Sequence, residues 1–322
     1  MKTQWWSLAA LLVLLLLNAV MNPAFFAVSI HDGQLYGSLI DIAFRSVPLI
    51  LTALGMTLVI ATGGVDLSVG STAAFAGACA TLALGGGWLS ALAAALLGGL
   101  AVGLFNGLLI TALGLQPIIA TLISMVSTRG LAQLVLGGQI LPIANPSYVA
   151  IGTSAFLGVP VAIWIVVFSC LVLSLLLRRT TAGLFIEAVG ANSLASRFIG
   201  LSEKKVRLVV YTLAGLFAAL SGVVLSTNIR AVDGNNLGLY LELDAILAVV
   251  IGGTRLSGGR FSLLGTVFGA LIIQTVTTTI NTQGIRVELM LMVKALVVIA
   301  ICLAQSTRVS QLWTRLRQGA MS

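Results

Sequence analysis

The chain has 322 residues, of which 59% are hydrophobic and 8% are charged. Soluble domains carry roughly 25% charged residues, so this composition cannot cover a soluble surface. It excludes a disordered chain, a secreted disulfide scaffold and a cytosolic enzyme, and it places the protein in lipid. The formal net charge of +8 is compatible with nucleic acid or anionic lipid, and the positions of the basic residues decide between them.

Ten long apolar segments follow one another along the chain. A membrane-spanning helix needs about 20 apolar residues, whereas a membrane barrel shows alternating strands of about ten. Runs such as Leu8–Leu17 are continuous, so we expect an all-α integral membrane protein with about ten transmembrane helices in a single domain over 1–322. The expected segments are 5–22, 44–62, 68–84, 88–112, 117–137, 159–178, 206–227, 241–253, 263–283 and 288–304.

Two of these segments leave alternatives open. The first has the Leu-rich stretch of a secretory signal peptide, but no clear A-x-A cleavage site follows it, which favours an uncleaved helix. The eighth, 241–253, is short for a span, so it is either tilted and extended into its flanks or a broken helix.

The basic residues indicate the orientation of the chain, because cytoplasmic loops are enriched in Lys and Arg. With the N-terminus inside, twelve of the 17 basic residues fall on the cytoplasmic side. The remaining five are Arg45, Arg230 and Arg286 outside, and Arg129 and Lys294 within spans. We therefore expect both termini in the cytoplasm, together with a loop over about 178–207 and a tail over about 305–322. The orientation of the chain in the membrane accounts for the excess of basic residues, so we expect no nucleic-acid partner.

Two turns share a pattern that indicates an internal repeat. Residues 63–70 and 252–259 both read G-G-x-x-L-S-x-G, and both follow a Val-Ile pair. Repeats are frequent in transporters, although a chance match in a Gly-rich chain is the alternative. The matched turns, both expected on the cytoplasmic side, contain Gly63, Gly64, Asp66 and Ser68, and Gly252, Gly253, Arg255 and Ser257. Because Asp66 and Arg255 carry opposite charges at the same position, we expect them to neutralise one another or a shared neighbour.

The sequence shows no catalytic apparatus. It lacks a Walker A motif, its single His31 lies in an expected outer loop, and no pair of membrane-buried carboxylates is evident. The three cysteines lie in apolar runs without metal-ligand spacing. We therefore expect no catalytic residue, no metal site and no cofactor on this chain. Its loops are too short for a folded domain, so any ATP-hydrolysing or ligand-binding domain must be another chain.

Polar residues within the fifth segment are candidates for a solute path, because such groups are costly in hydrocarbon. Thr121, Ser124 and Thr128 follow at i, i+3 and i+7, on one face. Arg129 lies beside them, about 18 Å into the membrane from Pro117. Arg129 either lines a polar path and contacts a hydroxylated solute, or ties helices together through backbone carbonyls.

The ninth segment carries a second polar stripe, formed by Gln274, Thr277, Thr278 and Asn281. These uncharged groups suit a neutral polyol better than an ion, and hydrogen bonding between helices is the alternative. Asn106 of the fourth segment can likewise either contact a solute or form a hydrogen bond between helices. It lies beside Gly99, Gly103 and Gly107, which we expect to let two helix backbones approach closely.

The cytoplasmic loop contains a short helix of its own. Asn192 can cap a helix over Ser193–Ile199, and Gly200 can end it. Leu194 and Phe198 give that helix an apolar face. A helix of this kind outside the membrane fits a groove on a partner, and folding back onto its own bundle or onto the lipid surface is the alternative.

Three separated motifs resemble one protein family. They are Thr62–Gly70, Glu187–Asn192, and Glu242–Ile246 leading into Val249–Gly253. These segments are similar to permease subunits of bacterial ribose/galactose-type monosaccharide importers of the ATP-binding-cassette superfamily, and the likeness runs from about residue 44 to 304. Segments 32–38 and 228–236 look most like permeases of galactofuranose importers. Branched-chain amino-acid permeases are more distant relatives.

The resemblance implies a multi-pass permease in the bacterial inner membrane, which carries a monosaccharide and catalyses no reaction. Its partners would be a periplasmic sugar-binding protein, a second permease subunit and ATPase subunits that bind ATP and magnesium. The implied coupling segment toward the ATPase comprises Glu187, Ala188, Gly190, Asn192, Leu194, Phe198 and Gly200. Asp233, Asn235 and Asn236 are candidates for contact with the binding protein, and a solvated turn is the alternative.

A second hypothesis is a secondary transporter or channel for a small polar solute that works without an ATPase. Lys294 with Glu288, or Asp66 with Arg255, would then be the coupling groups. The absence of an evident membrane-central carboxylate argues against proton coupling, and the short cytoplasmic helix argues for an ATPase partner.

Overall fold

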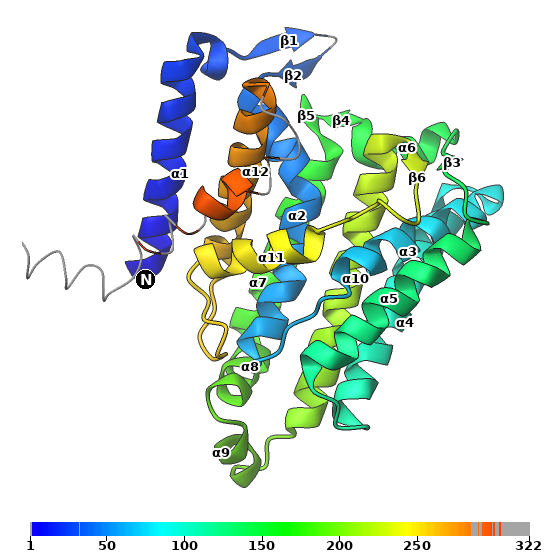
Figure 1. Ribbon diagram of the computed structural model, residues 1–322, viewed down its shortest axis with the longest axis vertical. Helices are drawn as coiled ribbons and strands as arrows, with labels where there is room; N and C mark the ends of the chain where they lie inside the picture. The colour runs from blue at the N-terminus through cyan, green and yellow to red at the C-terminus, as the bar shows by residue number, and fades with distance from the viewer. Residues whose placement is uncertain are drawn as a thin grey trace, which may run out of the picture.

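The computed structural model describes residues 2–31, 33–284, 289, 292–297, 299 and 303, and these form a bundle of helices (Figure 1). The elements are α1 (Lys2–Met21), η1 (Pro23–Phe26), β1 (Ser29–His31), β2 (Gln34–Tyr36), α2 (Ser38–Ala61), α3 (Val69–Ala83), η2 (Leu84–Gly86), α4 (Trp88–Thr111), α5 (Pro117–Val135), β3 (Leu141–Pro142), α6 (Pro146–Thr153), β4 (Ala155–Phe156), β5 (Val159–Pro160), α7 (Val161–Arg179), α8 (Ala182–Ala191), α9 (Ser193–Phe198), α10 (Glu203–Ile229), β6 (Ala231–Val232), α11 (Leu241–Ile251) and α12 (Leu263–Thr282).

The short strands mark one end of the bundle and α9 marks the other. The pairs β1–β2, β3–β6 and β4–β5 are all antiparallel. They lie together at the end far from α9 (Figure 1). We call these the strand end and the α9 end.

Seven of the described helices are long and apolar enough to cross a membrane. They are α2, α3 extended through η2, α4, α5, α7, α10 and α12, and each coincides with an expected segment. The first expected segment forms α1, and the eighth forms α11, whose 11 residues are too few for a span. The tenth, 288–304, falls mostly outside the described residues. The chain is therefore a multi-pass helical membrane protein with seven candidate spans in its described part.

Helix α2 forms the core of the bundle. Every residue from Ser46 to Ala61 is buried. A helix that is apolar all round needs protein on every side, and α2 is flanked by α7, α10, α11 and α12. The other candidate spans are less enclosed, with α5 and α7 the most exposed.

Small residues bring α4 against α10, as the glycine spacing predicts. A Cβ on Gly99 would overlap Gly215 and Ala219, and a Cβ on Gly103 would overlap the backbone of Tyr211. Such close approach of backbones needs small residues at the contact.

Gly103→Val is expected to destabilise the protein by about 1–3 kcal/mol, because the added side chain forces α4 away from α10. The measurement is the melting temperature of the detergent-purified chain. Gly130→Val is the matched control, since Gly130 lies on α5 with nothing within 4 Å of an added Cβ. Equal melting temperatures for the two variants would contradict the packing role.

Two helices begin inside the bundle after non-helical segments. Residues 62–68 run from the lower end of α2 to the start of α3 near mid-height, and 233–240 lead into α11 (Figure 1). By itself, the 15-residue α3 extends about 22 Å and the 11-residue α11 about 16 Å, both short of a hydrocarbon core of about 30 Å. Helix α3 reaches the length of a candidate span only together with η2. The first repeat turn therefore continues into the interior, whereas the sequence predicts a surface turn.

Candidate functional site

The two repeat turns and α8 meet backbone to backbone near the lower end of α2. The amide of Gly259 donates a hydrogen bond of 2.9 Å to the carbonyl of Ala61. Gly258, at φ +85°, lies against the backbones of Gly63 and Gly190. A Cβ on Gly190 would overlap the Ala61 carbonyl oxygen. We call Ala61, Gly63, Gly190, Gly258 and Gly259 the glycine junction.

Two further glycines of the repeat turns, Gly64 and Gly252, also allow close contacts. A Cβ on Gly64 would overlap the hydroxyl of Tyr211, and one on Gly252 would overlap the backbone at Gly265, at the start of α12. Gly253 takes a φ of +89°, which favours glycine. Ser257 is exposed, and its carbonyl lies over Gly63.

Asp66 is enclosed where α3 begins, with only 1% of its surface exposed. Its carboxylate accepts hydrogen bonds from the amide and hydroxyl of Ser68, at 2.9 and 2.7 Å. The side-chain amide of Asn106 donates to the Ser68 hydroxyl at 2.7 Å. Arg255, by contrast, is exposed, and none of the described ion pairs joins it to Asp66. The predicted direct pairing of Asp66 with Arg255 is therefore wrong, because Ser68 and not Arg255 binds the carboxylate; neutralisation of a shared neighbour stays a prediction.

The structure encloses a second carboxylate, although the sequence shows no evident pair of membrane-buried carboxylates. Glu242, in the first turn of α11, is 9% exposed and lies against Gly70 of α3. Together with Asp66 it places two carboxylates at the starts of interrupted helices. Their burial depends on non-helical segments folding inward, which hydropathy alone does not reveal.

Arg129 binds the segment that precedes α11. Its Nη1 donates a 2.6 Å hydrogen bond to the carbonyl of Leu237, and Glu242 and Asp233 are the carboxylates that interact with its charge. Arg129 therefore ties α5 to a backbone carbonyl in this conformation. This agrees with the second of the two predicted roles, in which Arg129 holds helices together. Four residues further along α5, Gln133 donates to Asn235 at 3.2 Å.

Asp233 organises an exposed turn at the strand end. Its carboxylate accepts from the Asn235 amide at 2.8 Å and from the Asn236 side chain at 2.6 Å. Partial desolvation raises the pKa of Asp233, but these hydrogen bonds and the charge of Arg129 outweigh it, so the pKa lies below its usual value. Asn235 and Asn236 are exposed. The turn is thus held by its own hydrogen bonds, and its two asparagines are accessible.

The polar stripes are mostly turned inward. Thr121, Ser124 and Thr128 are enclosed within the chain, on the side where α5 meets α3, as is Asn106 of α4. The outward face of α5 is apolar instead, and includes Ile119, Ile123, Val126 and Leu134.

The second stripe lies elsewhere in the molecule. Gln274 and Thr277 of α12 are half-buried and Asn281 is exposed, and Gln274 donates to Thr278 at 3.3 Å. Because α12 and α5 lie on different sides of the bundle, the structure does not bring the two stripes together (Figure 1). Lys294, offered as a coupling group with Glu288, forms a 2.9 Å ion pair with Asp244; Glu288 lies outside the described residues.

Helix α9 forms the tip of the α9 end. The Asn192 side chain accepts from the Ala195 amide at 3.0 Å, and Gly200 follows at φ +82°, which confirms the predicted cap and stop. Phe198 is 91% exposed and Leu194 65%, so α9 does not fold back onto its own bundle. Its apolar face is open to another surface.

Glu203 fixes α9 to α10, a role that our sequence analysis missed. Its carboxylate, 8% exposed, binds Arg197 of α9 at 2.8 Å and Arg207 of α10 at 3.1 Å. The i, i+4 spacing of Glu203 and Arg207 was the available signal. One helical turn beyond Arg207, the Tyr211 hydroxyl donates to the Val65 carbonyl at 3.4 Å, next to Asp66.

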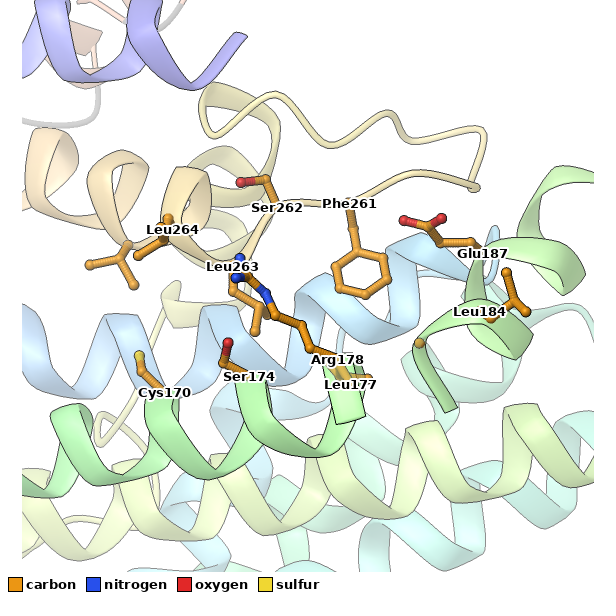
Figure 2. Close-up of a pocket in the computed structure, with 12 residues that line it drawn as sticks. Cys170, Ser174, Leu177, Arg178, Leu184, Glu187, Phe261, Ser262, Leu263 and Leu264 are labelled. Carbon is orange, nitrogen blue, oxygen red and sulfur yellow. The ribbon is translucent and has the colours of Figure 1, made fainter. Parts of the chain in front are cut away.

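Glu187 and Ala188 are half-buried on α8. Glu187 lines a cavity of about 430 Å³ between α7, α8 and the start of α12 (Figure 2). None of the eight residues proposed for a solute path lines it.

Comparison with known proteins places these features in a family. A family model described as "Branched-chain amino acid transport system / permease component" matches residues 38–302. The chain belongs to this permease family. The match covers both repeat turns, α8, α9 and the turn at Asp233.

Three relatives from two bacteria are sugar permeases. The chain is 46% identical to the galactofuranose transporter permease protein YtfT of Escherichia coli (strain K12), over 94% of this chain and 89% of that protein. It is 40% identical to the fructose import permease protein FruF of Bifidobacterium longum (strain NCC 2705), over 97% and 90%. It is 34% identical to the ribose import permease protein RbsC of Escherichia coli (strain K12), over 94% and 93%. No solved structure matches the chain.

Proposed function

We propose that the chain is the membrane-spanning subunit of a binding-protein-dependent importer that carries galactofuranose or a related monosaccharide, driven by a separate ATPase. The family match over 38–302 and the three sugar permeases support this function, and 46% identity to the galactofuranose permease supports that sugar. The single structural observation that carries the proposal is α9, whose apolar face stands free at one tip of the molecule. A transporter working alone would have no use for such a face.

The orientation follows from the basic residues. We place the α9 end and both termini in the cytoplasm of a bacterial inner membrane, with the strand end facing the periplasm. The exposed turn at Asp233, Asn235 and Asn236 then faces the sugar-binding protein. A second permease subunit, identical or paralogous, completes the path, and ATP with magnesium is bound on the ATPase.

The contacts around α9 suggest how the ATPase moves the permease. Movement of α9 acts on α10 through the Arg197–Glu203–Arg207 ion pairs, and on α2 through Gly190 and the glycine junction. Both routes reach segment 62–68. The route through α10 reaches it because Tyr211 donates a hydrogen bond to the Val65 carbonyl, and the other route reaches it because Gly63 belongs to the glycine junction. Repositioning this segment would open the enclosed polar side chains of α3, α4 and α5 to sugar.

Glu203→Gln is expected to lower sugar uptake about tenfold while the ATPase remains associated, because the amide holds two arginines less strongly than the carboxylate does. Uptake by cells and ATPase recovery on the tagged permease are the two measurements. Lys204→Gln, at an exposed neighbour, is the matched control. Equal uptake in the two variants would contradict transmission through Glu203.

The function itself is tested in two steps. A tagged chain is recovered from its native membranes in mild detergent, and its partners are identified by mass spectrometry; we expect an ATPase and a permease subunit. Cells lacking the chain are then tested for uptake of labelled galactofuranose, fructose and ribose, with loss of galactofuranose uptake expected. Recovery without any ATPase, under conditions that keep a known importer intact, would refute the proposal.

A further inference from the structure

The cavity between α7, α8 and α12 has an apolar wall and a charged mouth (Figure 2). Its volume of about 430 Å³ is typical of sites that hold a small molecule. The apolar lining comes from Leu177 of α7, Leu184 of α8, and Phe261, Leu264 and Val267 at the start of α12. Two charged residues, Arg178 and Glu187, also line it.

The cavity runs along α7 in the direction of the membrane normal. Cys170, Ser174, Leu177 and Arg178 line it at i, i+4, i+7 and i+8, so they share one face of the helix. Arg178 and Cys170 are eight residues apart, or about 12 Å along the helix axis. With the α9 end in the cytoplasm, Arg178 lies at the level of the inner-leaflet headgroups and Cys170 lies among the acyl chains. The charged end of the cavity therefore lies at the depth of a phospholipid headgroup, and its apolar end lies at the depth of the acyl chains.

The cavity lies at the outer surface of the helix bundle, where its lining is exposed. Helix α7 has the highest mean hydropathy of the seven candidate spans, yet only 28% of its apolar window is buried, against 83% for α2. Leu184 and Leu264, on opposite sides of the cavity, are 67% and 56% exposed. A membrane lipid can therefore enter from the side.

The two charged groups at the mouth do not satisfy one another. The guanidinium of Arg178 extends toward Leu263, and the carboxylate of Glu187 lies on the other side of the Phe261 ring (Figure 2). No ion pair joins either of them to another described residue. The mouth thus offers one cation and one anion to a ligand.

We propose that this cavity binds phosphatidylethanolamine, with the phosphate at Arg178, the ammonium toward Glu187 and one acyl chain along the apolar wall. The zwitterionic headgroup matches both charges, whereas phosphatidylglycerol has no cation for Glu187. Inorganic phosphate would leave the apolar wall unused. The proposal rests on the proposed function only for the orientation of the chain.

A bound lipid would brace the coupling segment. Helix α8 lines the cavity through Gly183, Leu184 and Glu187, and its next turn carries Gly190 of the glycine junction. The lipid would therefore join α7 and α12 to the helix that leads into α9.

The test is lipid retention by the purified full-length chain, measured by native mass spectrometry. The protein is exchanged into micelles that hold equal amounts of phosphatidylethanolamine and phosphatidylglycerol with the same acyl chains. We expect the wild type to retain phosphatidylethanolamine preferentially. Arg178→Ala should reduce that retention about tenfold, the loss expected for one charge-assisted contact. Arg179→Ala, which removes a neighbouring arginine outside the cavity, should retain it normally.

Two further variants keep the test independent of Arg178 should that variant fail to fold. Glu187→Gln should abolish the preference for phosphatidylethanolamine over phosphatidylglycerol, and Ser174→Trp should fill the cavity and remove the bound lipid. Equal retention of the two lipids by the wild type, no retained lipid, or equal behaviour of the Arg178 and Arg179 variants would overturn the proposal. The assay uses neither sugar nor ATPase, so its failure leaves the importer function untouched.

Discussion

Phe198→Asp is expected to abolish both sugar uptake and recovery of the ATPase, while the permease still inserts and folds. Phe198 is 91% exposed, so the charge costs the fold little. In the assembled importer the same side chain would fill an apolar groove, and truncating such an anchor typically costs about 2 kcal/mol or more, roughly thirtyfold in affinity. A buried carboxylate is worse still, because it loses its hydration. Uptake, ATPase co-purification and the melting temperature of the permease are the three measurements.

Leu157→Asp provides the control for this prediction. Leu157 is 76% exposed in the turn between β4 and β5, at the strand end. The same charge is introduced far from α9, so ATPase recovery should equal that of the wild type. If Phe198→Asp also retains the ATPase and normal uptake, α9 is not the coupling helix.

The helices and their boundaries were largely predictable from sequence, since they depend on local chemistry. Pro117 occupies the first turn of α5, where its missing amide proton costs nothing. Asn192 caps α9 as its side chain allows, and Gly200 ends it with a positive φ. The apolar runs then supply the spans, because lipid leaves a backbone no other way to satisfy its polar groups.

The interior of the site was not predictable, since it depends on which segments fold inward. The opposite charges of Asp66 and Arg255 suggested pairing, yet one side chain is enclosed and the other is exposed. Thr121 and Ser124 do share one face of α5, and both are buried. Helical periodicity, however, cannot distinguish a face that lines water from a face packed on a neighbouring helix. Glu203 joins two helices through contacts that no single-segment pattern contains.

Gly190→Val is expected to abolish sugar uptake while the ATPase still associates. The added Cβ would overlap the Ala61 carbonyl oxygen, which accepts the 2.9 Å hydrogen bond of the glycine junction, and would approach the Gly259 amide, which donates that bond. Neither backbone can yield without separating α8 from α2. The apolar face of α9 is left intact, so ATP hydrolysis should continue without sugar transport. Uptake and hydrolysis by the reconstituted importer measure this uncoupling.

Ala191→Val is the matched control, because it places the same β-branched side chain at the next position of α8, where the native residue is exposed. It should transport normally. Gly190→Ala introduces the overlap with the smallest possible side chain and should fall between the control and Gly190→Val. If Gly190→Val transports as well as Ala191→Val does, the junction can open without cost, and force from α9 would have to reach segment 62–68 through Glu203 and α10 alone.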